Sequence, residues 1–265
     1  MAKASSYIED PRLIDQDTIW NLSDRAVIYS QSLRLLSEEL GWIVLSINAS
    51  LFSNRYQSES SGSLRQDWPR IPLPNDRNQL QHSAQLGQRL AHLLDPETPV
   101  ETITRGAITP PYRAIAVPTT IHGGNLKPEE FQLTASWGHG GNGKPVMPGK
   151  GRVVQRDYTN AEREGMGEGA IALLGEKTND IYLNDTAYWS NIPDRVWKYT
   201  IGGYQVLKKW LSYRSFKVLG RPLKPDEIRH VAETARRISA IILMEPDLDD
   251  NYQAIKQNTY PWPKD

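Results

Sequence analysis

The spacing of apolar residues changes near Pro96, and this change most constrains the fold. Before it, apolar residues recur every three or four positions, which predicts mostly helical structure over 24–52 and another helix that ends near residue 95. After it, short β-forming runs alternate with Gly and Pro, which predicts strands at 112–117, 131–137, 152–158, 181–183 and 196–201. A last helix is predicted to begin at Pro225. We therefore expect an α+β fold, in which an N-terminal helical region precedes a small mixed or antiparallel β-sheet domain with packed helices.

The same change predicts two domains. Residues 1–95 are expected to form a helical spacer or docking region, and residues 96–265 a β-containing domain. In the first of these, the segment Trp68–Pro74 contains three prolines, which exclude a helix and a central strand and predict an extended course. Residues 58–63 and 165–170 are expected to be loops and 245–251 to be surface, whereas the structure of the whole segment 165–175 is ambiguous from its sequence.

Composition narrows the class of protein. The chain has 265 residues, equal numbers of basic and acidic side chains at 31 each, and no cysteine. Its composition is that of an ordinary globular chain. Without cysteine it cannot form disulfides or Cys-based zinc sites. The absence of disulfides is common in cytoplasmic proteins, and we expect this chain to act in the cytoplasm. No apolar run approaches the ~20 residues needed to span a bilayer, so we expect no membrane partner.

The stretch Val196–Arg214 carries the strongest functional signal. Its first residues favour a strand, Gly202-Gly203 is expected to end that strand, and 204–213 is expected to form a short amphipathic helix. At 100° per residue, one half of this helix is apolar and aromatic, and the other half carries Gln205, Lys208, Lys209 and Ser212.

The region around this helix is strongly basic. Residues 195–237 contain eleven Lys or Arg against three acids, a net charge of +8 in a chain whose total is zero. This asymmetry is expected of a nucleic-acid-binding surface. The alternative is a solvated helix face with no partner.

Two motifs match known sites only in part. Gly138–Lys144 has the G-x4-G-K spacing of a phosphate loop, but Pro145 follows where that loop needs Ser or Thr. A basic hairpin loop that faces DNA is a better interpretation, and an ordinary glycine-rich turn is the alternative. Thr109–Tyr112 reads TPPY where amino-methyltransferases carry Asn or Asp before Pro-Pro-aromatic, so we interpret it as an extended turn.

No catalytic or metal-binding constellation is recognisable. The five histidines lack H-x3-H and H-E-x-x-H spacing, so no metal is expected. The carboxylates form no pair that sequence identifies as a general acid and base. The sequence therefore identifies no catalytic residue. Whether this chain is itself an enzyme stays undecided.

Two stretches resemble a known family. Leu64–Pro74 (LRQDWPRIPLP) and Val196–Arg214 (VWKYTIGGYQVLKKWLSYR) are similar to the C-terminal specificity region of type ISP restriction–modification enzymes and related adenine-specific DNA methyltransferases. Supporting similarities are the helix with Leu86–Leu90, the stretch Thr134–Arg152 and the closing segment Leu223–Met244. The resemblance covers roughly residues 40–256.

The resemblance implies a role in DNA target recognition. In such phage-defence enzymes an upstream domain binds S-adenosylmethionine and methylates adenine N6, and some also carry a nuclease and a helicase. This chain lacks the cofactor loop and the Asn-Pro-Pro-aromatic motif. We therefore expect the recognition part alone, as a separate subunit, a split gene or a truncated product, without a cofactor of its own. The expected partners are double-stranded DNA and a methyltransferase domain or subunit.

The candidate DNA contacts fall in two groups. Lys208 and Lys209 are expected at phosphates and Gln205 at a base edge, and the neighbouring candidates are Lys198, Ser212 and Arg214. A second DNA-facing loop is expected to carry Lys144, Lys150, Arg152 and Arg156.

The alternative function is a protein-interaction scaffold. In that case the helical half, 24–94, docks a separate methyltransferase, and the chain does not bind DNA by itself. Arg70, which lies between prolines, is expected at the junction with the methyltransferase domain.

Overall fold

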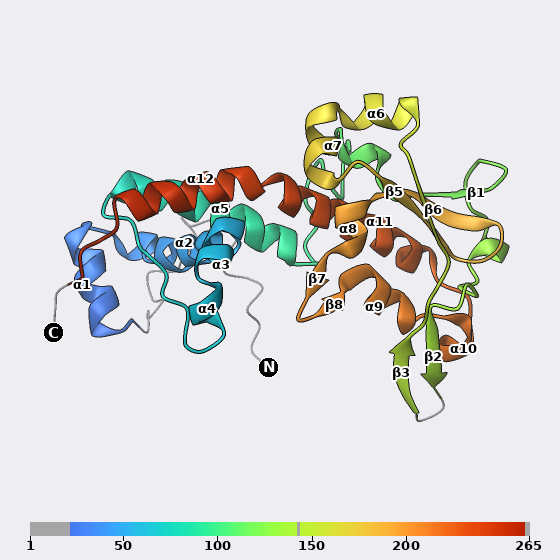
Figure 1. Cartoon of the computed structure of the whole chain (residues 1–265), viewed down its shortest axis with the longest axis horizontal. Coiled ribbons are helices and arrows are strands. Elements are labelled where there is room, and N and C mark those ends of the chain that lie inside the picture. The colour runs from blue at the N-terminus through green and yellow to red at the C-terminus, as the bar shows by residue number, and fades with distance from the viewer. Residues whose placement is uncertain (1–21, 142–143, 263–265) are drawn as a thin grey trace. The chain divides into compact units, whose positions relative to one another are not determined.

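A computed structural model describes residues 22–141 and 144–262, and the chain forms two compact units (Figure 1). Unit 1 combines the residues up to Asp95 with those from Met244 onward, and unit 2 comprises Pro96–Leu243. In the described residues, unit 1 is helical and unit 2 holds the β-sheets, so the predicted α+β class is confirmed.

Unit 1 is a cluster of helices. Its elements are α1 (Asp24–Ser32), the 3-10 helix η1 (Ser37–Glu39), α2 (Gly41–Leu51), α3 (Asn54–Glu59), α4 (Ser61–Leu64), α5 (Arg77–Leu94) and α12 (Glu245–Gln257). Asp76 caps α5, because its Oδ1 accepts a hydrogen bond from the Gln79 backbone amide at 2.9 Å. Helices α2 and α5 pack with little space between their backbones, since a Cβ on Gly87 would lie 1.9 Å from the Leu45 carbonyl oxygen.

The C-terminal segment corrects the expected domain organisation. Residues 244–265 were expected in the β-containing domain, but they belong to unit 1. The physical reason is that α12 is not an acidic surface tail. It buries Leu248, Tyr252 and Ile255 and packs against α2, α3 and α5.

Other local predictions in unit 1 have mixed outcomes. The helix expected over 24–52 is interrupted after α1, where Arg34 has a positive φ of 54°. Residues 58–63 are largely helical rather than a loop, because they form the end of α3 and most of α4. The proline-rich segment 68–74 forms neither a helix nor a named strand, as predicted, and it leaves Trp68 85% exposed.

Unit 2 is built on a four-stranded antiparallel sheet. The strands are β1 (Val117–Thr120), β4 (Val153–Arg156), β5 (Thr178–Tyr182) and β6 (Ala187–Pro193), in the spatial order β1-β6-β5-β4. The helices of this unit are η2 (Tyr112–Ala114), η3 (Pro128–Glu130), α6 (Asn160–Met166), α7 (Glu168–Leu174), α8 (Asp194–Lys198), α9 (Val206–Ser212), α10 (Phe216–Leu219) and α11 (Pro225–Leu243). The helix predicted to begin at Pro225 is confirmed as α11, but α12 follows it, so it is not the last helix. The buried Trp189 of β6 donates its indole hydrogen to the Ile228 carbonyl at 3.1 Å.

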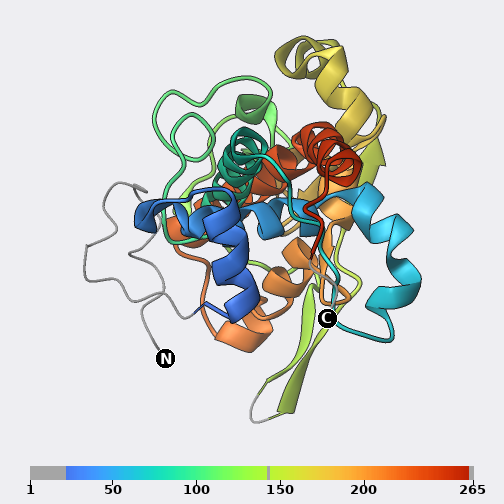
Figure 2. The ribbon, with the colours of Figure 1, turned by 90° about the vertical axis from the view of Figure 1, so that its left-hand side faces the viewer.

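Two small hairpins complete unit 2. They are β2 (Gly138–Gly141) with β3 (Lys144–Pro148), and β7 (Thr200–Ile201) with β8 (Tyr204–Gln205). The β2–β3 hairpin packs against α9 and α10, and it protrudes from the rest of unit 2 in both Figure 1 and Figure 2.

Several predicted strands of unit 2 are wrong. Residues 112–114 form the 3-10 helix η2, and of 112–117 only Val117 lies in a strand. Residues 131–137 are irregular, and 196–199 lie mainly in α8. The segment 165–175 is helical, because it contains the end of α6 and all of α7. The predictions near 152–158 and 181–183 correspond to β4 and to the end of β5. No helix among the described residues is both long and apolar enough to cross a membrane.

Candidate nucleic-acid interface

The glycine pair Gly202-Gly203 turns the chain between β7 and β8. Both residues have positive φ, 57° and 81°, as a two-residue hairpin turn of the primed type requires. Ile201 and Tyr204 are paired across this turn, so their side chains lie on the same face of the hairpin. The sequence correctly placed a break here, but the break is a hairpin turn rather than a strand-to-helix junction.

An exposed face forms where this hairpin meets α9. Lys209 of α9 places its Nζ 4.7 Å from the ring centroid of Tyr204 and 4.8 Å from that of Tyr213. Tyr204 is 57% exposed, Tyr213 is 42% exposed, and Ile201 beside them is 58% exposed. We call these four residues the tyrosine–lysine face. A cation held between two aromatic rings is suited to an anionic partner with flat groups.

The predicted polar half of α9 is only partly at the surface. Ser212 is fully buried, and its hydroxyl donates to the Lys209 carbonyl at 2.7 Å. Its expected contact with DNA is therefore wrong, because the hydroxyl cannot reach an outside partner. The Gln205 amide donates to the Trp197 carbonyl at 3.2 Å and is half-buried, so it faces α8 rather than outward. Lys208 is half-buried.

Arg214 belongs to an internal stack. Its guanidinium lies 4.1 Å from the Trp210 ring centroid, and Trp210 stacks on His230 at 4.9 Å. Arg214 also lies 3.6 Å from Glu227, which Arg221 binds at 2.7 Å. Burial, followed by the positive charge of Arg214, lowers the pKa of His230 below its ordinary value. Arg214 thus fastens α9 to α11 and is not a free cation for a phosphate.

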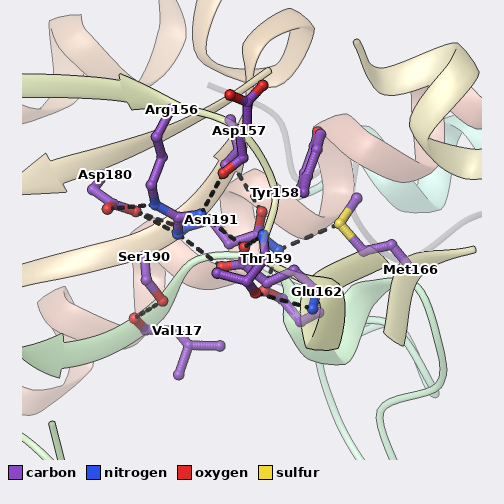
Figure 3. A network of polar contacts seen from close by, with 12 residues as sticks. Val117, Arg156, Asp157, Tyr158, Thr159, Glu162, Met166, Asp180, Ser190 and Asn191 are labelled. Atoms are coloured by element: carbon purple, nitrogen blue, oxygen red, sulfur yellow. Dashed lines mark hydrogen bonds and ion pairs between the residues drawn. The ribbon is translucent and has the colours of Figure 1, made fainter. Parts of the chain in front are cut away.

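Arg156 lies in a polar network at one end of the sheet (Figure 3). Its guanidinium binds both carboxylate oxygens of Glu162 at 2.7 Å and both of Asp180 at 2.8 and 3.0 Å. Oδ1 of Asp180 also accepts a hydrogen bond from the backbone amide of Asn191 at 3.1 Å. The hydrogen bonds and charge of Glu162 and Asp180 raise the pKa of Arg156. This residue therefore ties β4, β5 and α6 together, and its expected contact with DNA stays a prediction.

The remaining basic candidates differ in their surroundings. Arg152 places its guanidinium 4.0 Å from the Tyr182 ring centroid and 3.5 Å from Asp185. Lys198 forms an exposed ion pair with Asp194 at 2.7 Å, of a kind that contributes little to stability. The side chain of Lys144 lies outside the described part of the chain. Lys150 is exposed and lines a cleft beside the β2–β3 hairpin.

That cleft lies between the base of the hairpin and α10. Its volume is about 440 Å³, and it is lined by Leu133, Thr134, Ser136, Gly138, His139, Pro148, Gly149, Lys150, Ser215, Phe216 and Lys217. Lys217 belongs to the basic segment 195–237, but neither Lys217 nor His139 was among the residues predicted to contact DNA. His139 and Lys217 line the same cleft because β2 contacts α10, and no local sequence pattern predicts that contact.

The structure bears on the two partial motifs. Strands β2 and β3 pair as an antiparallel hairpin, and no helix begins among the described residues of 138–144, whereas a phosphate loop requires one there. That this hairpin faces DNA stays a prediction. In the TPPY segment, Thr109 donates its hydroxyl to the Thr102 carbonyl, and the Tyr112 carbonyl accepts from Arg236. Among the described residues, no group of three His, Cys, Asp or Glu side chains is placed to hold a metal ion.

Comparison with known proteins gives one match. The model of the type ISP C-terminal specificity domain matches residues 45–240, a range that runs from α2 into α11 and includes both stretches on which the resemblance was stated. No curated protein and no solved structure matches the chain.

Proposed function

Because the chain belongs to the type ISP C-terminal specificity domain family, we propose that it binds double-stranded DNA and reads the target sequence of a restriction–modification enzyme. The tyrosine–lysine face is the observation that carries this proposal. It combines a cation with exposed aromatic rings on the segment that also carries most of the family resemblance. Phosphate contacts by such cations supply affinity, and neighbouring side chains at base edges supply selectivity.

The chemistry of the enzyme is assigned to a partner. We propose that a methyltransferase domain uses S-adenosylmethionine to methylate adenine N6 at the site that this chain selects. The segment of this chain most similar to the catalytic motif, TPPY, has Thr109 in place of Asn or Asp, and the Thr109 hydroxyl donates to the Thr102 carbonyl. The residues of this chain would therefore position DNA rather than react with it.

Replacing both Lys208 and Lys209 with glutamine tests the proposal. We expect weaker binding to all duplexes alike, and a salt slope that becomes less steep by about 1 for each lysine that contacts a phosphate. The measurement is fluorescence anisotropy with labelled duplexes over a series of salt concentrations, in the presence of random-sequence competitor.

The matched control replaces Lys127 and Lys224 with glutamine. Both are exposed residues of unit 2 outside the tyrosine–lysine face, and the change in net charge is the same. If the two double variants give the same slope and affinity, Lys208 and Lys209 do not contact DNA. If the parent chain binds no duplex at any salt concentration, DNA recognition by this chain alone is wrong.

One observation favours the scaffold function as a second candidate. Trp68 is 85% exposed on the extended proline-rich segment of unit 1, next to the exposed Arg70. An exposed Trp beside an Arg is the composition of a protein-binding hot spot. In this case, a methyltransferase domain would cover the segment.

Trp68→Ser separates this function from DNA binding. If the segment docks a methyltransferase, the variant should recover the cognate methyltransferase with at least ~10-fold lower affinity in a pull-down, while binding to duplex DNA is unchanged. Val44→Ser is the control, since Val44 is also exposed in unit 1 and lies on α2. Equal recovery by both variants would exclude Trp68 from the contact.

A further inference from the structure

We propose that the cleft between the β2–β3 hairpin and α10 is a phosphate-binding site that holds one phosphodiester of bound DNA. The inference rests on the proposed function for the source of the phosphate. It adds a second contact region with a defined shape, formed by residues that lie far apart in the sequence. Two exposed lysines line the cleft, Lys150 two residues after β3 and Lys217 in α10.

The cleft carries positive charge, and no carboxylate lines it. Its lining contains two lysines and His139 but no Asp or Glu. Among the described residues, neither Lys150 nor Lys217 forms an ion pair, whereas Arg156, Arg214 and Lys198 lie against carboxylates. Two ammonium groups that share one cleft repel each other, and an anion between them removes that repulsion.

The wall of the cleft is tightly packed. Trp137 is fully buried behind it, and its indole donates to the Tyr182 carbonyl at 2.7 Å. Ser136 is held at a φ of 57°, in the left-handed region that is unfavourable for serine. At Gly149 a Cβ would lie 2.1 Å from the Ser136 carbonyl oxygen, so the chain leaves the hairpin in direct contact with this wall. A site with a fixed wall loses little entropy when a ligand binds.

The other lining residues indicate which anion fits. Leu133, Pro148 and Phe216 give the cleft an apolar side, and Thr134 and Ser136 add hydroxyl groups. Its volume of about 440 Å³ lies within the range of ~300–1,000 Å³ typical of ligand pockets. A phosphodiester with its attached sugar matches this combination, because the phosphate needs the cations and hydroxyls while the sugar packs on Phe216.

The first experiment uses the salt dependence of DNA binding. The variants are Lys150→Gln, Lys217→Gln and the double variant, and the control is the Lys127→Gln, Lys224→Gln chain. Since one phosphodiester is shared by two lysines, we expect the double variant to reduce the salt slope by about 1, and each single variant to produce only a small part of that reduction, because the other lysine still contacts the phosphate. The control should keep the slope of the parent chain.

The second experiment separates the two sources of phosphate. In amide-detected NMR of the ¹⁵N-labelled full chain, titration with a short duplex is expected to shift the signals of Ser136, Gly149, Lys150 and Lys217. Inorganic phosphate and deoxyadenosine monophosphate serve as free-phosphate probes, and we expect them to shift the same signals only at much higher concentration.

The outcomes distinguish this inference from the proposed function. If the chain binds DNA but the double variant keeps the parent slope and the duplex leaves the cleft signals unmoved, DNA recognition stands and the cleft is not a phosphate site. If duplex DNA does not bind but free phosphate shifts the cleft signals until they saturate, the cleft binds free phosphate rather than DNA. The proposed function would then be wrong, whereas the phosphate site would be confirmed. If no probe shifts these signals, the inference is overturned.

Discussion

Replacing Arg156 with methionine is expected to lower the free energy of unfolding by about 3 kcal/mol. Arg156 binds Glu162 and Asp180 with four hydrogen bonds of 2.7–3.0 Å, and Asp180 is buried. Methionine keeps most of the apolar stem but leaves two carboxylates close together without a cation. Removal of one partner from a shielded ion pair is strongly destabilising, because the remaining charge is neither solvated nor paired.

The destabilisation should depend on pH. Burial raises the pKa of Glu162, but the hydrogen bonds from Arg156 and Thr159 together lower it by more. Its pKa therefore lies below the ordinary value. A carboxyl group with a lowered folded-state pKa stabilises the fold above its unfolded pKa and loses that contribution as the pH falls through the folded pKa. In Arg156→Met this acid-dependent contribution should be reduced.

Urea unfolding of both chains, measured at neutral pH and at several acidic pH values, checks this expectation. Arg152→Met is the matched control, because Arg152 is an exposed arginine next to the same strand, and its ion pair with the exposed Asp185 should contribute less than ~1 kcal/mol. If the two variants unfold at the same urea concentration, the network of Figure 3 does not stabilise unit 2.

Replacing Gly138 with alanine is expected to destabilise unit 2 by about 2–3 kcal/mol and to displace the β2–β3 hairpin. A Cβ at this position would lie 1.9 Å from the Ser212 carbonyl oxygen and 2.8 Å from its carbonyl carbon. Both are backbone atoms of the end of α9, so no side-chain rotation can relieve the overlap. The β2–β3 hairpin and α9 must therefore separate, and this movement should also change the cleft that the hairpin forms with α10.

Thermal unfolding and amide hydrogen exchange test this prediction. We expect faster amide exchange at Val146, Met147 and Gly149 of Gly138→Ala and a lower unfolding temperature. Gly169→Ala is the control, since Gly169 lies inside α7 with no heavy atom within 4 Å of the added Cβ. Alanine there should be neutral or should stabilise by up to ~1 kcal/mol. Normal exchange in the hairpin of Gly138→Ala would show that β2 can move away from α9 at no cost.

Long helices were predictable because their signals are local. Helices α5 and α11 combine regular apolar spacing with an Asp76 cap or an initial Pro225, and both agree with prediction to within a few residues. The strand expected at 131–137 failed for the opposite reason. Leu133 and Trp137 are buried as an alternating pattern requires, but they pack from irregular backbone, and no sheet partner is present there among the described residues.

The candidate site was predictable in position but not in orientation. The sequence identified Lys209 and the glycine turn, but it assigned Tyr204 and Tyr213 to the packed side of α9, and the structure leaves them exposed around Lys209. The charge count also overstated the free positive surface, because Arg214 and Arg221 share Glu227, and Arg237 is buried. A sequence records how many cations a segment has, but not which of them the fold uses internally.

The division of unit 1 into two stretches of chain has a consequence for biosynthesis. Helix α12 buries Leu248, Tyr252 and Ile255 against helices made long before it, and all of unit 2 is translated in between. On the ribosome, unit 2 can fold as soon as it has emerged, whereas α2, α3 and α5 must wait for α12 with part of their apolar surface uncovered. Nascent chains that stop at Leu243 should therefore present a folded unit 2 and an incomplete unit 1, and chaperones would be expected to bind the latter.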